Sequence, residues 1–142
     1  MNRYLLLILL AVVVPVLARA SDRDLRGSKS ESERFQTVRD AERFTIGGVG
    51  YAGVPSREET AFRQIIKQHG ASVLCQKLLT EATPAGQLYG LLGLRILDEQ
   101  AFKAALPRYK KSKMVVLTMS GCIGFPTSAG ELVHKIETGK MK

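Results

Sequence analysis

Cys122 and His134 are the residues of this 142-residue chain whose types and order suggest a nucleophile with its base. A thiol becomes a thiolate at neutral pH beside an imidazole or a helix N-terminus. Cys122 lies in the glycine-flanked stretch SGCIG, shortly before a predicted helix, where backbone amides could stabilise an oxyanion. A thiol-dependent enzyme using Cys122 with His134 is therefore one hypothesis. The alternative is that both residues are structural.

The stretch GVGYAG at 48–53 matches the G-x-G-x-x-G pattern of phosphate-binding loops and follows the β-prone residues 44–46. In a dinucleotide-binding loop the helix begins at the second glycine, so that its amides meet the pyrophosphate. Here Pro55 and Ser56 place the helix start after the third glycine. We therefore expect a tight turn held close to the helices, and we expect no nucleotide partner.

The remaining polar residues predict no metal or other cofactor, since His69, Cys75, Cys122 and His134 do not have ligand spacing. A basic run is the candidate anion site; it consists of Arg108, Lys110, Lys111 and Lys113, next to Tyr109. The alternative for this run is a solvated loop.

The two cysteines, Cys75 and Cys122, leave two possibilities open. An even count in an exported chain suggests a disulfide, whereas the apolar stretch around each is typical of a buried free thiol.

The N-terminal residues 1–20 have the features of a cleavable signal peptide. Arg3 precedes an apolar run, Pro15 interrupts it, and Ala18 and Ala20 are the small residues that a signal peptidase reads. The chain is therefore expected to be exported, to the periplasm or the extracellular space. The alternative is an N-terminal membrane anchor.

The charge pattern sets the domain boundaries and the class of partner. Residues 21–40 are rich in charge and serine, which predicts a flexible polar spacer before a single domain at 41–142. The formal net charge is +8, and removal of Arg3 and Arg19 with the leader reduces it to +6. This moderate charge does not indicate a nucleic-acid partner, and it suits an anionic lipid surface or envelope polymer.

Helical periodicity dominates the predicted domain. Ser56 to Glu59 form a capping box before the first helix, and residues 71–82 carry a regular apolar stripe. Thr83 and Pro84 start an almost wholly apolar central helix, in which Gly86, Gly90 and Gly93 predict a close approach by a neighbouring helix.

Three further elements complete the predicted fold. Asp98 caps a helix that Pro107 ends or kinks, residues 114–119 form a short buried strand that could pair with 44–46, and a last helix covers about 128–138. The expected fold is mainly α: a compact helical-hairpin (HEAT-like) domain of four to five helices with a short extended or β segment.

The stretches FTIGGVGYAG, EATPAGQLYGLLGL and LPRYKKSKMVVLTMSGC resemble a family of small exported proteins described as uncharacterised. The resemblance covers about residues 44–136 and implies no activity, substrate, cofactor or functional residue. It implies that the glycine stretch, the central helix and the SGC turn form one structural unit.

Three functions from different classes follow. The first is an exported helical module that acts by contact with an unidentified protein partner or as a structural component of the envelope. The second is the thiol-dependent enzyme, and the third is binding to an anionic surface through residues 108–113.

Overall fold

The structure, a computed structural model, describes residues 27–28 and 30–141. The chain divides into two units, residues 1–33 and 34–142, and the fold described below is that of the second unit. The predicted signal peptide at 1–20 lies outside the described residues.

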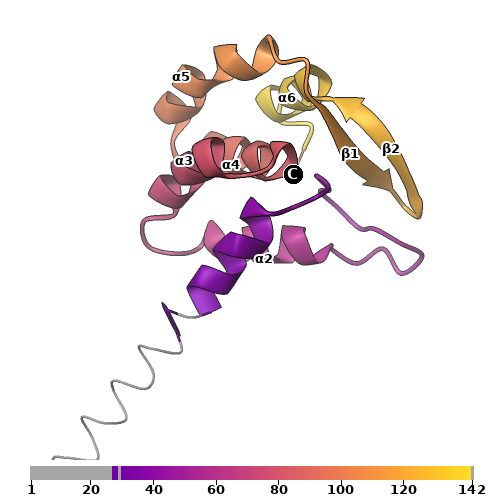
Figure 1. The fold of residues 1–142 in the computed structure, drawn as a ribbon, viewed down its shortest axis with the longest axis horizontal. Coiled ribbons are helices and arrows are strands. Elements are labelled where there is room, and N and C mark those ends of the chain that lie inside the picture. The colour runs from indigo at the N-terminus through magenta and orange to yellow at the C-terminus, as the bar shows by residue number, and fades with distance from the viewer. Residues whose placement is uncertain (1–26, 29, 142) are drawn as a thin grey trace, which may run out of the picture. The chain divides into compact units, whose positions relative to one another are not determined.

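The second unit is mainly helical with a short β segment, as the sequence predicts, and this segment is a two-stranded hairpin (Figure 1). It opens with a helical segment that ends at residue 39. The elements that follow are α2 (Arg57–Ile65), α3 (Ala71–Glu81), α4 (Pro84–Leu97), α5 (Glu99–Lys110), β1 (Val115–Ser120), β2 (Ile123–Ser128) and α6 (Ala129–Glu137).

The helices begin at the caps expected from the sequence. The hydroxyl of Ser56 accepts a hydrogen bond from the amide of Glu59 at 3.0 Å, and Thr83 accepts one from the amide of Gly86 at 3.1 Å. Asp98 accepts one from the amide of Ala101 at 3.0 Å. Each cap satisfies an amide that the helix itself leaves unpaired, and this fixes where the helix starts. Pro107 does not end α5, which continues to Lys110.

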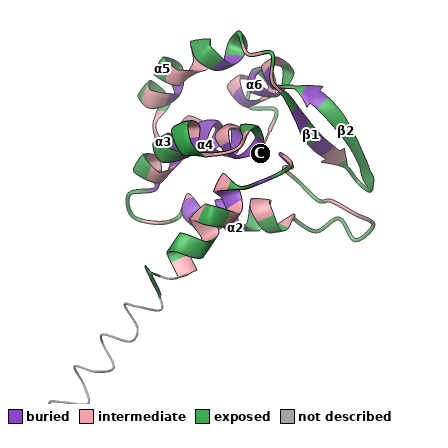
Figure 2. Cartoon of the chain, viewed as in Figure 1, coloured by how far each residue is buried: buried purple, intermediate pink, exposed green. Residues whose placement is uncertain are grey.

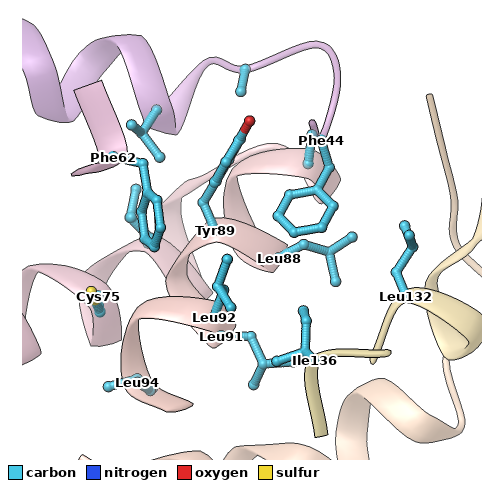
Figure 3. Packing of buried hydrophobic residues seen from close by; sticks show 14 of the residues in the cluster. Phe44, Phe62, Cys75, Leu88, Tyr89, Leu91, Leu92, Leu94, Leu132 and Ile136 are labelled. Atoms are coloured by element: carbon cyan, nitrogen blue, oxygen red, sulfur yellow. The ribbon is translucent and has the colours of Figure 1, made fainter. Parts of the chain in front are cut away.

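The central helix of the core is α4, as its apolar composition predicts. Leu88, Tyr89, Leu91 and Leu94 are fully buried along it (Figures 2 and 3). Around them pack residues of α2, α3, α5 and α6, and the core includes Leu132, Val133 and Ile136 of the last helix.

The glycines of α4 let α3 approach it closely, as expected. A methyl group added at Gly90 would lie 2.8 Å from the carbonyl oxygen of Cys75 and 2.9 Å from Cβ of Leu78. One added at Gly93 would overlap Sγ of Cys75. Because later residues of α4 meet earlier residues of α3, the two helices are antiparallel. They form the most closely packed helical hairpin of the fold.

The predicted polar spacer at 21–40 is too long. Residues 34–39 are helical, and Val38 is completely buried in the core. The carbonyl oxygen of Arg39 accepts a hydrogen bond from the amide of Thr83 at 2.9 Å, and a methyl group at Gly86 would lie 2.5 Å from the carbonyl oxygen of Val38. The apolar side chains among the charges give this segment a buried face.

The strand predicted at 114–119 is present, but it is half of a hairpin. β1 pairs antiparallel with β2, from Val115 opposite Ser128 to Ser120 opposite Ile123. β2 was not predicted from the sequence because it contains Gly124 and Pro126, which are unfavourable in a strand. Proline is nevertheless tolerated at the edge of a sheet.

The predicted pairing of residues 44–46 with the strand is also present. The amide of Phe44 donates to the carbonyl oxygen of Leu117 at 2.9 Å, within a parallel bridge between Arg43 and Leu117. A second parallel bridge joins Val49 to Gly121. β1 therefore lies between β2 and the segment that carries the glycine stretch.

Candidate functional site

Cys122 lies in the two-residue turn between β1 and β2, and its thiol is exposed. Gly121 occupies the first central position of this turn with φ of 57°, a left-handed conformation that favours glycine. β2 separates Cys122 from α6, and its six extended residues span about 20 Å. His134 is exposed on α6, and among the described residues no hydrogen bond links it to Cys122. The structure therefore does not assemble the predicted nucleophile and base.

The disulfide proposed between Cys75 and Cys122 is absent, because both cysteines are free. Cys75 is completely buried between α3 and α4, where its sulfur fills the space opposite Gly93. Burial raises the pKa of the Cys75 thiol to about 12, since the core disfavours the thiolate. The two sulfurs thus lie in opposite environments, one in the core and one at a hairpin turn.

The basic run at 108–113 does not converge on one site. The guanidinium of Arg108 lies over the ring of Tyr109, 5.5 Å from its centroid, and Lys110 forms an ion pair with Glu137 at 2.8 Å. Tyr109 belongs to the core, and its hydroxyl donates to Oε1 of Gln87 at 3.1 Å. Lys111 is exposed and Lys113 follows it in the loop before β1, so the run is divided among three different surroundings.

The glycine stretch is anchored at its N-terminal side by Tyr89 of α4. The phenol of Tyr89 donates to the carbonyl oxygen of Thr45 at 2.8 Å and accepts from the amide of Thr45 at 3.1 Å. The ring lies between Phe44 and Phe62, with centroid distances of 4.8 and 5.3 Å (Figure 3). Burial raises the pKa of Tyr89, so the phenol stays a donor. The Thr45 hydroxyl is also 2.8 Å from the hydroxyl of Ser56.

Glu59 anchors Gly47, the residue that directly precedes the glycine stretch. Its carboxylate is completely buried, and Oε2 accepts the amide of Gly47 at 3.0 Å. Oε1 accepts Nε of Arg63 at 2.8 Å and forms an ion pair with the same guanidinium. A buried carboxylate requires such partners because its desolvation is costly. In the predicted capping box this side chain would reach back to Ser56; it turns to Gly47 instead.

Three backbone amides of the glycine stretch are bonded within the protein. Val49 donates to the carbonyl oxygen of Val54 at 2.9 Å, and Gly53 donates to that of Gly50 at 3.3 Å. Gly50 donates to the carbonyl oxygen of Gly121, in the β1–β2 turn, at 2.8 Å. A phosphate-binding loop directs such amides at its ligand, so this arrangement favours the structural interpretation of the glycines.

The glycine stretch and the hairpin turn together present apolar side chains to solvent. Tyr51 is fully exposed, Ile123 is 70% exposed, and Val54 and Phe125 are 56% and 42% exposed. We call these four residues the paired-loop surface, because the bond between Gly50 and Gly121 joins the two loops that carry them. Exposed apolar groups that gather in this way are typical of contact sites.

The described residues contain neither a metal-binding cluster nor a membrane-spanning helix. Within residues 27–28 and 30–141, no three side chains of His, Cys, Asp or Glu gather closely enough to hold a metal ion. In the same part of the chain, none of the helices has the length and apolarity needed to cross a bilayer.

Sequence reasoning missed the contact of Glu59 with Gly47, the role of Tyr89 and the apolar side chains of β2. One signal for Glu59 was available: it shares a helical face with Phe62, three residues later, and a carboxylate on an apolar face is a candidate for burial. Ile123 and Phe125 carried no such signal, because Gly124 and Pro126 obscured their strand.

Comparison of the chain with protein-family models, with curated proteins and with solved structures found no match. The assignment of a function therefore depends on the chemistry and geometry of the chain itself.

Proposed function

We propose that this protein is an exported contact module: a helical scaffold that presents the paired-loop surface to a partner in the envelope or the extracellular space. The observation that carries the proposal is the exposure of Tyr51, Val54, Ile123 and Phe125 on a loop and a β-hairpin that hydrogen-bond to each other. Export follows from the signal-peptide features of residues 1–20.

The way the loops are built supports this role. An exposed loop without internal anchors would lose conformational entropy on binding, which weakens association. Here Tyr89 and Glu59 fix the start of the glycine stretch, and Gly121 fixes its middle. A side chain such as Tyr51 therefore projects from a main chain that is already ordered.

Site-specific photocrosslinking in the producing cell tests the proposal. A photoreactive phenylalanine analogue replaces Tyr51 in one variant and Val73 of α3, which is 67% exposed, in the other. Figure 1 shows α3 on the other side of the molecule from the hairpin, so the second variant is a matched control. We expect a discrete crosslinked product, with protein or with lipid, from position 51 alone. Equal yields from the two positions, or none from position 51, would overturn the proposal.

A further inference from the structure

We propose that the paired-loop surface inserts into the surface of an anionic lipid bilayer. This inference rests on the proposed function and names the chemistry of the partner. It places the contact at residues 51, 54, 123 and 125, and not at the basic run 108–113 considered from the sequence.

The two loops belong to long uncharged stretches of the second unit. Residues 44–56 and residues 114–130 contain no Asp, Glu, Lys or Arg, although 24% of the chain is charged. The parallel bridges of Arg43 with Leu117 and of Val49 with Gly121 bring these two stretches side by side. Placing a charged side chain in the apolar part of a bilayer is costly. Insertion of these two stretches avoids that cost because they contain no charged side chain.

Part of the main chain of the two loops is hydrogen-bonded within the protein. The amides of Val49, Gly50 and Gly53 are bonded to carbonyl oxygens within the two loops. An unpaired amide in a lipid environment costs several kcal/mol, which excludes most irregular loops from that environment. The three bonds reduce the number of polar main-chain groups that insertion would bring into contact with lipid.

The apolar side chains lie on both faces of the hairpin. In the observed register Phe125 is opposite Thr118 and Ile123 is opposite Ser120, so both lie on the face that carries the buried Val116. Leu117 is 43% exposed and lies on the other face. A flat protein partner covers one face of a hairpin, whereas lipid surrounds both.

Cations lie at the ends of the uncharged stretches. Arg43 precedes the first stretch, Arg57 follows it, and Lys113 precedes the second. None of the three forms an ion pair with a carboxylate of the described residues, and Arg43 instead donates to Sδ of Met119 at 3.3 Å.

Among the described residues, the carboxylates near the loops do not form ion pairs with Arg43, Arg57 or Lys113. Glu131, which follows the second stretch, is paired with Lys135 at 2.7 Å, and Glu59 is buried against Arg63. Glu42 and Glu58 stand one residue farther from the loops than Arg43 and Arg57. An apolar tip with cations behind it matches the acyl boundary and the anionic headgroups of a bilayer.

Vesicle cosedimentation tests the inference directly. The purified protein is mixed, under reducing conditions, with vesicles of phosphatidylglycerol and phosphatidylcholine or with vesicles of phosphatidylcholine alone. We expect binding to the anionic vesicles that weakens as salt is raised, because exposed charges are screened. The Tyr51→Ser/Ile123→Ser variant is expected to bind about tenfold more weakly, since it loses two inserted apolar groups.

Two further variants complete the comparison. Val73→Ser removes an equally exposed apolar group from α3 and is expected to bind like the wild type. Arg57→Gln is expected to weaken binding to the anionic vesicles and to leave the low binding to phosphatidylcholine unchanged. All variants carry the same N-terminus, so differences between them report on the substituted side chains. Circular dichroism and the thermal midpoint establish that each variant is folded.

Each contrary outcome overturns the inference in a distinguishable way. If the wild type does not bind anionic vesicles while position 51 crosslinks to a protein in the cell, the lipid assignment fails and the contact module stands. If binding is lost in Lys110→Gln/Lys111→Gln but kept in Tyr51→Ser/Ile123→Ser, the contact lies at the end of α5. If the wild type neither binds vesicles nor crosslinks from position 51, the inference and the proposed function fail together.

Discussion

Cys75 packs against Gly93, so the effect of Gly93→Ala on the free energy of unfolding should depend on which side chain stands at position 75. Gly93→Ala adds a methyl group that overlaps Sγ of Cys75 and lies 3.3 Å from Cε2 of Phe62. Alanine gains up to about 1 kcal/mol over glycine in a helix interior. Overpacking costs about 1–3 kcal/mol, and neither helix can move freely because Gly90 brings the two backbones together. We therefore expect Gly93→Ala to destabilise the fold by about 2 kcal/mol.

Removal of the sulfur should reverse this loss. Cys75→Ala alone leaves a small void and is expected to cost about 1 kcal/mol. In the double variant the new methyl group fills that void, and it lies 3.4 Å from Cβ of residue 75. The double variant should then lie within about 1 kcal/mol of the wild type, with a coupling energy of about 2–3 kcal/mol.

Equilibrium urea unfolding of the four proteins, in reducing buffer and with a shared slope, measures this coupling. If the two single changes add to give the double variant, the sulfur does not occupy the space opposite Gly93. The antiparallel packing of α3 on α4 described above would then be wrong at its central contact.

The remaining predictions concern the anchors of the loops and the two thiols. Glu59→Gln keeps the volume but loses the charge-assisted bonds, so we expect about 1–2 kcal/mol of destabilisation and faster hydrogen exchange at the amide of Gly47; unchanged exchange there would show that the carboxylate does not hold the loop. Because burial raises the pKa of Cys75 from 9.0 to about 12, the unfolded chain loses this proton first as pH rises. Stability is full below pH 9.0 and should fall by up to about 1.4 kcal/mol per pH unit between 9.0 and about 12. Urea unfolding from about pH 8 to about pH 10 checks this, and the decline should be absent in Cys75→Ala below the range in which tyrosines titrate. Alkylation of the native protein followed by intact-mass analysis should label Cys122 rapidly and Cys75 only after unfolding; protection of both cysteines until reduction would restore the disulfide between them.

Much of the helical fold was predictable because its signals are local. Ser56, Thr83 and Asp98 are side chains that satisfy the first amides of a helix, so they mark the starts of α2, α4 and α5. The glycines of α4 were also informative, since their cost in a helix requires a compensating close contact. That contact with α3 is present.

Other features depend on contacts between residues distant in sequence and were missed for that reason. The extended conformation of β2 is set by its pairing with β1, and its own composition, with Gly124 and Pro126, argues against a strand. The burial of Val38 depends on its approach to Gly86, which a charged sequence context conceals.

The candidate site likewise combines features that local sequence signals predict with features that depend on contacts between distant residues. Periodicity and spacing correctly assigned the glycine stretch to a tight turn, and they indicated the pairing of residues 44–46 with the strand that follows α5. The expected close approach of this turn to the helices was wrong, because a methyl group added at Gly50 or Gly53 would meet nothing within 4 Å. Periodicity and spacing could not show that Glu59 binds Gly47 or that Gly50 binds Gly121. For Cys122 and His134 the sequence order suggested proximity, whereas β2 carries the chain away from the turn before α6 begins.

Hydroxyl-radical footprinting in the presence and absence of isolated envelope membranes tests the central claim most directly, because it reads the exposure of aromatic and large aliphatic side chains on several surfaces of one sample. Tyr51 and Phe125 lie on the paired-loop surface, and Val73 and Ile96, exposed on α3 and α4, serve as internal references. The account predicts that membranes reduce the oxidation of Tyr51 and Phe125 together and leave Val73 and Ile96 unchanged. Protection of Val73 and Ile96 with continued oxidation of Tyr51 would contradict it, and would place the contact surface on the helices.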